Sequence, residues 1–219
     1  MQRMGPLVHR IAHRGALLLI ASALVYLAGI VVAATSVFSG FSLNATTLAD
    51  LGTPSATRLF YLLVAAVALA GGLGFVGTLW IWTTLPARSS RTLGLLVLEI
   101  AFLAEILFSL SAPAGSTSNP IAHGAFLIFF FGAISVSMLL LALAMLRDPR
   151  WGGVRLYTLL SGFVSLAGTV LIARNGAGAL SAAGAEWISL GPWLLWLTVV
   201  GLHLSPFRVV PTSIPAIAS

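Results

Sequence analysis

Residues 93–110 read LGLLVLEIAFLAEILFSL, an apolar run that carries two glutamates, Glu99 and Glu105. A run of this length and hydropathy is typical of a helix that crosses a membrane. Because an ionisable side chain inside a membrane is costly, such residues usually face a protein interior, a water-filled cavity or a partner. The stretch therefore predicts the inner side of a bundle of membrane-spanning helices.

The composition of the whole chain agrees with this prediction. Of its 219 residues, 59% are hydrophobic and 7% are charged, and the mean hydropathy is +1.06. Ordinary soluble domains have about 25% charged residues, so a water-soluble protein is excluded. The length favours one compact helical bundle, because no polar stretch is long enough to form a separate soluble domain.

The residue types that are missing exclude several kinds of chemistry. The chain has no cysteine, which excludes disulfides, thiolate metal sites and iron–sulfur clusters. All eleven basic residues are arginine, so Schiff-base chemistry on a lysine is excluded as well. We expect no cofactor. We also expect no nucleic-acid partner, because the sequence lacks a basic stripe with interleaved aromatic residues.

Six apolar segments are long enough to cross a membrane, which predicts an all-α, polytopic bundle of six transmembrane helices. A single transmembrane domain over residues 15–204 would then follow a basic cytoplasmic arm, residues 1–14, and precede a short cytoplasmic tail, residues 205–219. In the second segment Ala70 and Gly74 lie four residues apart, a spacing that permits close contact with a neighbouring helix. The predicted helices cover residues 15–34, 59–84, 93–111, 123–146, 156–173 and 187–204.

The arginines near the helix ends predict the orientation of the bundle. Cytoplasmic loops of membrane proteins carry an excess of basic residues. Only two arginines, Arg58 and Arg174, fall on the proposed outer side. We therefore expect both termini in the cytoplasm of a cell, with the protein in the cell membrane as a multi-pass protein. The inner arginines are Arg3, Arg10, Arg14, Arg88, Arg91, Arg147, Arg150, Arg155 and Arg208.

This orientation brings several polar residues to the outer half of the bundle or its mouth. Glu105 lies about six residues below the outer end of its helix, roughly 9 Å deep. His123 opens the next helix across a short loop, so it can lie near Glu105 or Asp50. A carboxylate beside a histidine is suited to general acid–base catalysis, which makes these three residues the candidate catalytic groups. The outer polar residues are Asp50, Arg58, Glu105, His123, Arg174 and Glu186.

Arg58, Arg174 and Glu99 are candidate ligand-binding residues. In a simpler interpretation, Glu105 pairs with Arg58 or Arg174 only to neutralise charge inside the bundle. Glu99 lies six positions before Glu105, so the two side chains point about 120° apart and are separated by roughly 9 Å along the helix. The pair could line one cavity and form a proton path. Alternatively, Glu99 stays protonated and hydrogen-bonds a serine or a carbonyl of a neighbouring helix.

The histidines do not predict a metal or haem site. His123 and His203 lie at opposite membrane faces, and His9 and His13 belong to the amino-terminal arm. A bis-histidine haem or a three-ligand zinc site needs its ligands on one side of the membrane. We therefore expect no bound metal.

Two segments resemble a known family. They are LADLGTPSATRLFYLLVAAVALAGGLG, residues 48–74, and NPIAHGAF, residues 119–126. Together with six helices they are similar to a prokaryotic membrane family known as domain of unknown function 998. The resemblance implies that an acidic-Leu-Gly motif, here at 50–52, and a histidine that opens the fourth helix, here His123, mark the outer face. It implies no reaction, because the family itself is uncharacterised.

Three functions remain open from the sequence. The first is an outward-facing intramembrane pocket that binds or acts on a lipid or another small amphiphile, as helix-bundle interiors with a few polar groups often do. The second is a non-enzymatic accessory or assembly subunit of a larger membrane complex. The third is a proton-coupled transporter. Whether the protein is an enzyme is left open, and the expected partners are membrane lipids and a protein partner or a second copy within the membrane.

Overall fold

The computed structural model describes residues 6–37, 40–52, 55, 57–111, 120–174 and 181–205. The regular structure within these ranges is helical, apart from one antiparallel bridge between Val37 and Thr57. The helices are α1 (Pro6–Ala34), α2 (Leu48–Leu51), α3 (Phe60–Ile81), α4 (Ser89–Ser111), α5 (Pro120–Met145), α6 (Gly152–Ala173) and α7 (Ala182–Leu204), with short 3₁₀ turns at Trp82–Thr84 and Pro149–Trp151.

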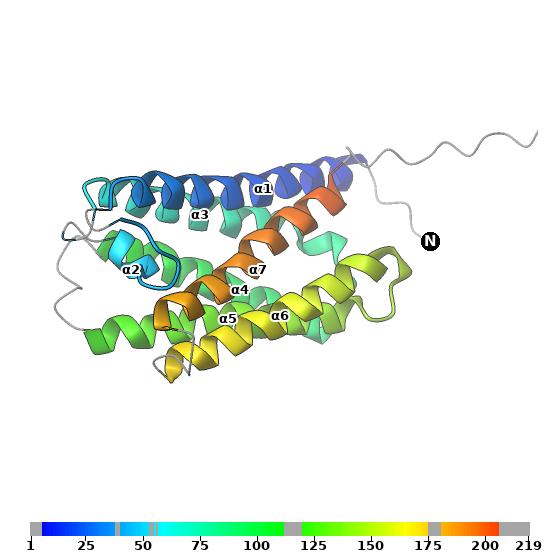
Figure 1. Ribbon diagram of the computed structural model, residues 1–219. Helices are drawn as coiled ribbons and strands as arrows, with labels where there is room; N and C mark the ends of the chain where they lie inside the picture. Colours follow the sequence, from blue (N-terminus) through cyan, green and yellow to red (C-terminus); the bar gives the residue numbers. More distant parts are fainter. Residues whose placement is uncertain are drawn as a thin grey trace, which may run out of the picture.

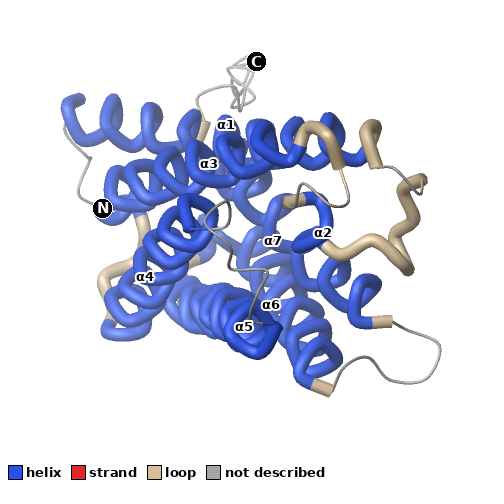
Figure 2. Tube along the Cα trace, turned by 90° about the vertical axis from the view of Figure 1, so that its left-hand side faces the viewer, coloured by secondary structure: helices blue, strands red, loops and turns tan. Residues whose placement is uncertain are grey.

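The long helices form a closed ring. Each packs against two others, in the order α1, α3, α4, α5, α6, α7 and back to α1. Figure 1 shows α1 and α3 side by side and α7 crossing the bundle obliquely, and Figure 2 shows the same helices in a view turned by 90°. The first and last helices of the chain are therefore neighbours, and both line the interior of the ring.

The bundle has two distinct ends. At the arginine-rich end lie the start of α1, the connections from α3 to α4 and from α5 to α6, and the end of α7 (Figure 1). At the opposite end, which we call the α2 end, lie α2 and the loop that carries it. This arrangement places most of the described arginines at the end away from the α2 loop, whereas Arg58 and Arg174 lie at the α2 end.

Five helices are long and apolar enough to cross a membrane: α1, α3, α5, α6 and α7. This is compatible with an integral, multi-pass membrane protein. Helix α4 has 23 residues but is not among the five; it carries both Glu99 and Glu105. The sixth span and the cytoplasmic position of the termini remain predictions.

Most of the long helices begin a few residues earlier than the sequence predicts. The first starts at Pro6 rather than at residue 15, so part of the expected arm is helical. Proline is well tolerated at the first position of a helix, where its missing N–H is not needed. Likewise α6 starts at Gly152 instead of residue 156, directly after a 3₁₀ turn whose cap is Asp148.

The start of α7 changes the position of a candidate residue. The helix begins at Ala182 instead of residue 187, because the Ser181 side chain caps it by accepting a 3.1 Å hydrogen bond from the Gly184 N–H. A serine at this position is a strong helix-start signal. Glu186, which the sequence places in a loop, is therefore held on the first turns of a helix.

Glycines on α3 allow two neighbours to approach its backbone. A Cβ on Gly74 would lie 2.2 Å from the Phe102 ring of α4, and one on Gly77 would lie 3.0 Å from Leu19 of α1. Carbon atoms rarely come this close, so both positions favour the absence of a side chain. The close helix contact expected from the small residues of this segment is present, with α4 at Gly74 and with α1 at Gly77.

Aromatic side chains fill the middle of the ring. Phe102 and Trp193 lie 5.4 Å apart between ring centroids, and Trp193 stacks on Trp196 at 5.5 Å. All three are buried. The Trp196 indole N–H donates a 3.0 Å hydrogen bond to the Thr158 hydroxyl, so its polar atom is satisfied inside the bundle, as buried tryptophans require.

Candidate functional site

Glu105 is buried inside the ring toward the α2 end. Its side chain is 3% exposed, and its Oε2 lies against the backbone of α3, 3.4 Å from where a Cβ on Gly71 would be. Glu105 Oε1 is buried and has no hydrogen-bond partner among the described residues. A buried polar atom without a partner costs free energy, so this oxygen is suited to receiving a proton or a ligand.

The two outer arginines do not neutralise Glu105. Arg58 and Arg174 are exposed, and neither forms an ion pair with the Glu105 carboxyl in the described part of the chain. The interpretation that Glu105 pairs with one of them is therefore not supported by the described contacts. Their expected role in ligand binding stays a prediction.

Two further groups accompany Glu105 in the interior. Tyr26 on α1 is 3% exposed and lies close enough to Glu105 and Glu186 for both carboxyls to act on it electrostatically. Glu186 on α7 is 4% exposed. The sequence interpretation missed Tyr26, although a phenol inside a predicted span is a polar signal. The sequence interpretation placed Glu186 in the outer half of the bundle or at its mouth, and the structure shows that this residue is buried.

The Glu186 carboxylate holds α2 in place. Its Oε2 accepts a 2.7 Å hydrogen bond from the N–H of Leu48, the first residue of α2. The next residue of α7, Trp187, donates from its indole N–H to the Thr46 carbonyl at 3.0 Å. Leu51, at the other end of α2, is fully buried. Helix α2 thus covers the ring at this end, which the sequence did not predict.

Asp50 has a structural role in the same segment. Its Oδ2 accepts a 2.9 Å hydrogen bond from the Thr47 N–H, and the Thr47 hydroxyl accepts a 3.0 Å bond from the Asp50 N–H. This reciprocal pair is the arrangement of a capping box. Asp50 also lies close enough to Glu186 for an electrostatic interaction, so the acidic-Leu-Gly segment belongs to the cover over the ring.

His123 lies near the amino-terminal end of α5. Its side chain is outside the described part of the structure, so its expected contact with Glu105 or Asp50 stays a prediction.

Glu99 differs from Glu105 because it has a partner. Its Oε1 is hydrogen-bonded to the Thr78 hydroxyl of α3. The same hydroxyl oxygen lies 2.9 Å from the carbonyls of Gly74 and Phe75. A hydroxyl has one hydrogen and two acceptor sites. The single hydrogen of the Thr78 hydroxyl is therefore shared among Glu99 Oε1 and the two α3 carbonyls.

The sequence interpretation expected a serine or a carbonyl as the partner of Glu99; the partner in the structure is a threonine hydroxyl, and the protonation of Glu99 stays a prediction. Glu99 Oε2 is buried and has no partner among the described residues. The Phe102 ring lies on α4 between the two glutamates in sequence and packs on Gly74. The glutamates therefore face α3 on either side of an aromatic residue.

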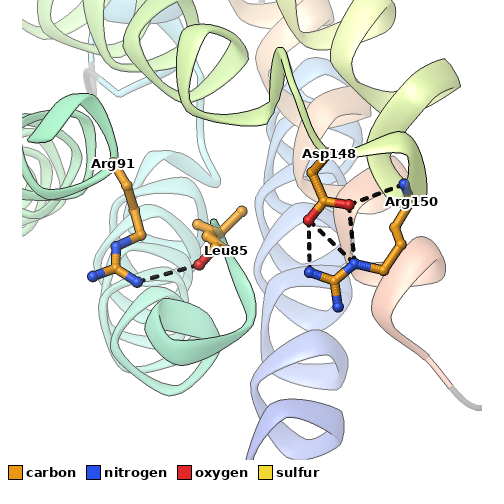
Figure 3. Close-up of polar contacts among 4 residues, drawn as sticks. All are labelled: Leu85, Arg91, Asp148 and Arg150. Atoms are coloured by element: carbon orange, nitrogen blue, oxygen red, sulfur yellow. Dashed lines mark hydrogen bonds and ion pairs between the residues drawn. The ribbon is translucent and has the colours of Figure 1, made fainter. Parts of the chain in front are cut away.

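At the arginine-rich end the charged side chains are used in local contacts, which Figure 3 shows. Arg91 Nη1 donates to the Leu85 carbonyl at 3.2 Å, and Arg150 forms a 2.6 Å ion pair with Asp148. The hydrogen bond from the Arg150 side chain lowers the pKa of the Asp148 carboxyl. Arginines near carbonyls at helix ends stabilise those ends.

The described residues contain no group of three or more histidine or acidic side chains placed to hold a metal ion. Comparison with known proteins adds no relative: no protein-family model matches the chain, and no curated protein or solved structure is significantly similar to it. The resemblance to the family of unknown function 998 accordingly stays a prediction.

Proposed function

We propose that the protein is an integral membrane protein that binds a small amphiphile inside the helix ring, with the polar group of the amphiphile at Glu105. One observation carries the proposal: Glu105 Oε1 is buried inside the ring and has no partner among the described residues. A hydrogen-bond donor on a ligand would satisfy this oxygen. Glu99, less than two turns away on the same helix, has Thr78 instead.

The position of Glu105 supports access from the α2 end. The residues that cover this end, α2 and its loop, are held by hydrogen bonds from Leu48 to Glu186 and from Trp187 to Thr46. Local opening requires only the contacts of this segment to break, which are these hydrogen bonds, those between Ser181 and Asn44 and the packing of the buried Leu51, fewer contacts than a long packed helix makes.

The proposal is tested by what co-purifies with the protein. Wild type, Glu105→Gln and Glu99→Gln are purified under the same mild conditions, and the bound small molecules are quantified by mass spectrometry. A hydrogen bond to a charged group contributes about 1.5–3 kcal/mol. We therefore expect Glu105→Gln to retain at most about one tenth of the ligand that the wild type retains. Glu99→Gln serves as the matched control, because the glutamine amide oxygen can still accept the hydrogen bond from Thr78.

Equal retention by all three proteins would contradict binding at Glu105. The other two functions suggested by the sequence give different results. An accessory subunit would bring down a stoichiometric protein partner in every variant. A proton-coupled transporter would show proton-linked uptake into liposomes, and Glu99→Gln would lose this uptake together with Glu105→Gln.

A further inference from the structure

We infer that the polar group bound at Glu105 is an organic cation, such as the ammonium group of an alkylamine. The inference rests on the proposed function and names the ligand class of that same site. It follows from the charges and the aromatic side chains that surround the Glu105 carboxyl.

The charges near the site are acidic. Glu105 and Glu186 are both buried and both act on Tyr26, and Asp50 lies near Glu186. No described basic side chain forms an ion pair with Glu105. A buried carboxylate requires a compensating charge or a proton. A cationic ligand supplies that charge, whereas an anionic ligand would add repulsion.

An aromatic pair, Phe102 and Trp193, lies about one helical turn from Glu105. The Glu105 carboxyl rests against Gly71 and the Phe102 ring against Gly74, two positions that are about 5 Å apart along α3. The Phe102 ring lies 5.4 Å from Trp193. The faces of aromatic rings attract cations, and ammonium groups are commonly recognised by such rings. A neutral head group gains nothing from this combination beyond a hydrogen bond.

The cation also accounts for the difference between the two glutamates. Glu99 Oε1 accepts a hydrogen bond from the Thr78 hydroxyl. Glu105 Oε1 is buried without a hydrogen-bond partner among the described residues, so an ammonium group would provide both a compensating charge and an N–H donor to this oxygen.

The test uses four probes with the same alkyl chain: hexylamine, hexyltrimethylammonium, hexanol and hexanoate. Each is titrated into full-length protein in detergent or in nanodiscs of zwitterionic lipid, with thermal unfolding and tryptophan fluorescence as readouts. Trp193 lies next to Phe102, so it reports on this part of the ring. We expect saturable binding of both cations, tighter for hexylamine because hexyltrimethylammonium has the charge but no N–H to donate to Glu105 Oε1, and at least tenfold weaker binding of hexanol and hexanoate than of hexylamine. The cation response is lost in Glu105→Gln and kept in Glu99→Gln.

Two results would overturn the inference. If hexanol binds as well as hexylamine and both lose binding in Glu105→Gln, the site takes a neutral head group; the proposed function stands and the cation inference fails. If none of the probes binds in a manner that depends on Glu105, the inference also fails, and the retention of co-purified molecules then decides the proposed function separately. A variant that does not fold is recognised by its unfolding curve, and Glu105→Asp, which keeps the charge, then replaces it.

Discussion

Glu99 and Glu105 are the same residue type on the same helix, yet their neighbours give them different roles. Both are buried and both face α3. Opposite Glu99 the third helix offers the Thr78 hydroxyl, whereas opposite Glu105 it offers Gly71, which has no polar side chain. The residue on the facing helix therefore decides whether a buried carboxyl is hydrogen-bonded to that helix or has an oxygen without a partner among the described residues.

The sequence predicted that these glutamates face the interior, because lipid penalises a carboxylate. It could not predict their partners. The contact between Glu99 and Thr78 depends on which residues of two separate helices meet, and apolar helices carry no local signal of their register against one another. Tyr26 was missed for the same reason, since nothing within its own span identifies Glu105 and Glu186 as neighbours.

Two glycines on α3 give a matched test of the close helix contact. In Gly74→Ala the new methyl group would lie 2.2 Å from the Phe102 ring, whereas a methyl group on Gly72 would have no atom within 4 Å. We expect Gly74→Ala to lower the free energy of unfolding by about 1–3 kcal/mol, the usual cost of overpacking. Gly72→Ala should change it by less than about 0.5 kcal/mol. Thermal unfolding in detergent distinguishes them, and equal stability of both variants would mean that α3 and α4 pack less closely at Gly74.

At the scale of single elements, α2 is a short cover whose position depends on other helices. It has four residues, too few for a helix to be stable alone. Its start is tied to α7 through Glu186, and its end is buried through Leu51. Sequence patterns cannot predict such an element, because its helical conformation comes from tertiary contacts rather than from its own periodicity.

Replacing Glu186 tests whether this carboxylate holds α2. In Glu186→Ala the Leu48 N–H loses its acceptor, whereas the amide oxygen of Glu186→Gln can still accept its hydrogen bond. A hydrogen bond of this kind contributes about 1 kcal/mol, so amide exchange over residues 47–51 should become roughly fivefold faster in the alanine variant. Hydrogen–deuterium exchange with mass spectrometry measures the rate. An unchanged rate in Glu186→Ala would show that Leu51 and Trp187 hold α2 without the carboxylate.

At the scale of the molecule, composition was enough to predict the helical class and the presence of several helices apolar enough to cross a membrane. The order of the helices around the ring was not predictable from it. That order depends on small-residue contacts between distant segments; for example, a Cβ on Gly201 of α7 would lie 2.6 Å from Ile20 of α1. Periodicity locates a helix in the chain but does not identify the helix it packs against.

The orientation of the bundle can be tested with single cysteines, because the chain contains none. Leu43 is 59% exposed in the α2 loop, and Ser89 is exposed at the opposite end of the bundle. The arginine distribution predicts that the Ser89 end is cytoplasmic. In intact cells a membrane-impermeant maleimide should label Leu43→Cys, and it should label Ser89→Cys only after permeabilisation. The reverse pattern would invert the proposed orientation.

The contact between α1 and α7 has a consequence for biosynthesis. Because the ribosome delivers helices in chain order, the first helix leaves the insertion machinery long before its last neighbour exists. Until then the side of α1 that later meets α7, where Gly201 packs on Ile20, remains open to lipid or to an assisting protein. Tyr26 and Glu105 likewise have no Glu186 nearby until α7 has been synthesised. The ring is therefore closed only after α7 has been inserted between α6 and α1. A chain truncated before α7 would expose the polar groups of the interior on that side.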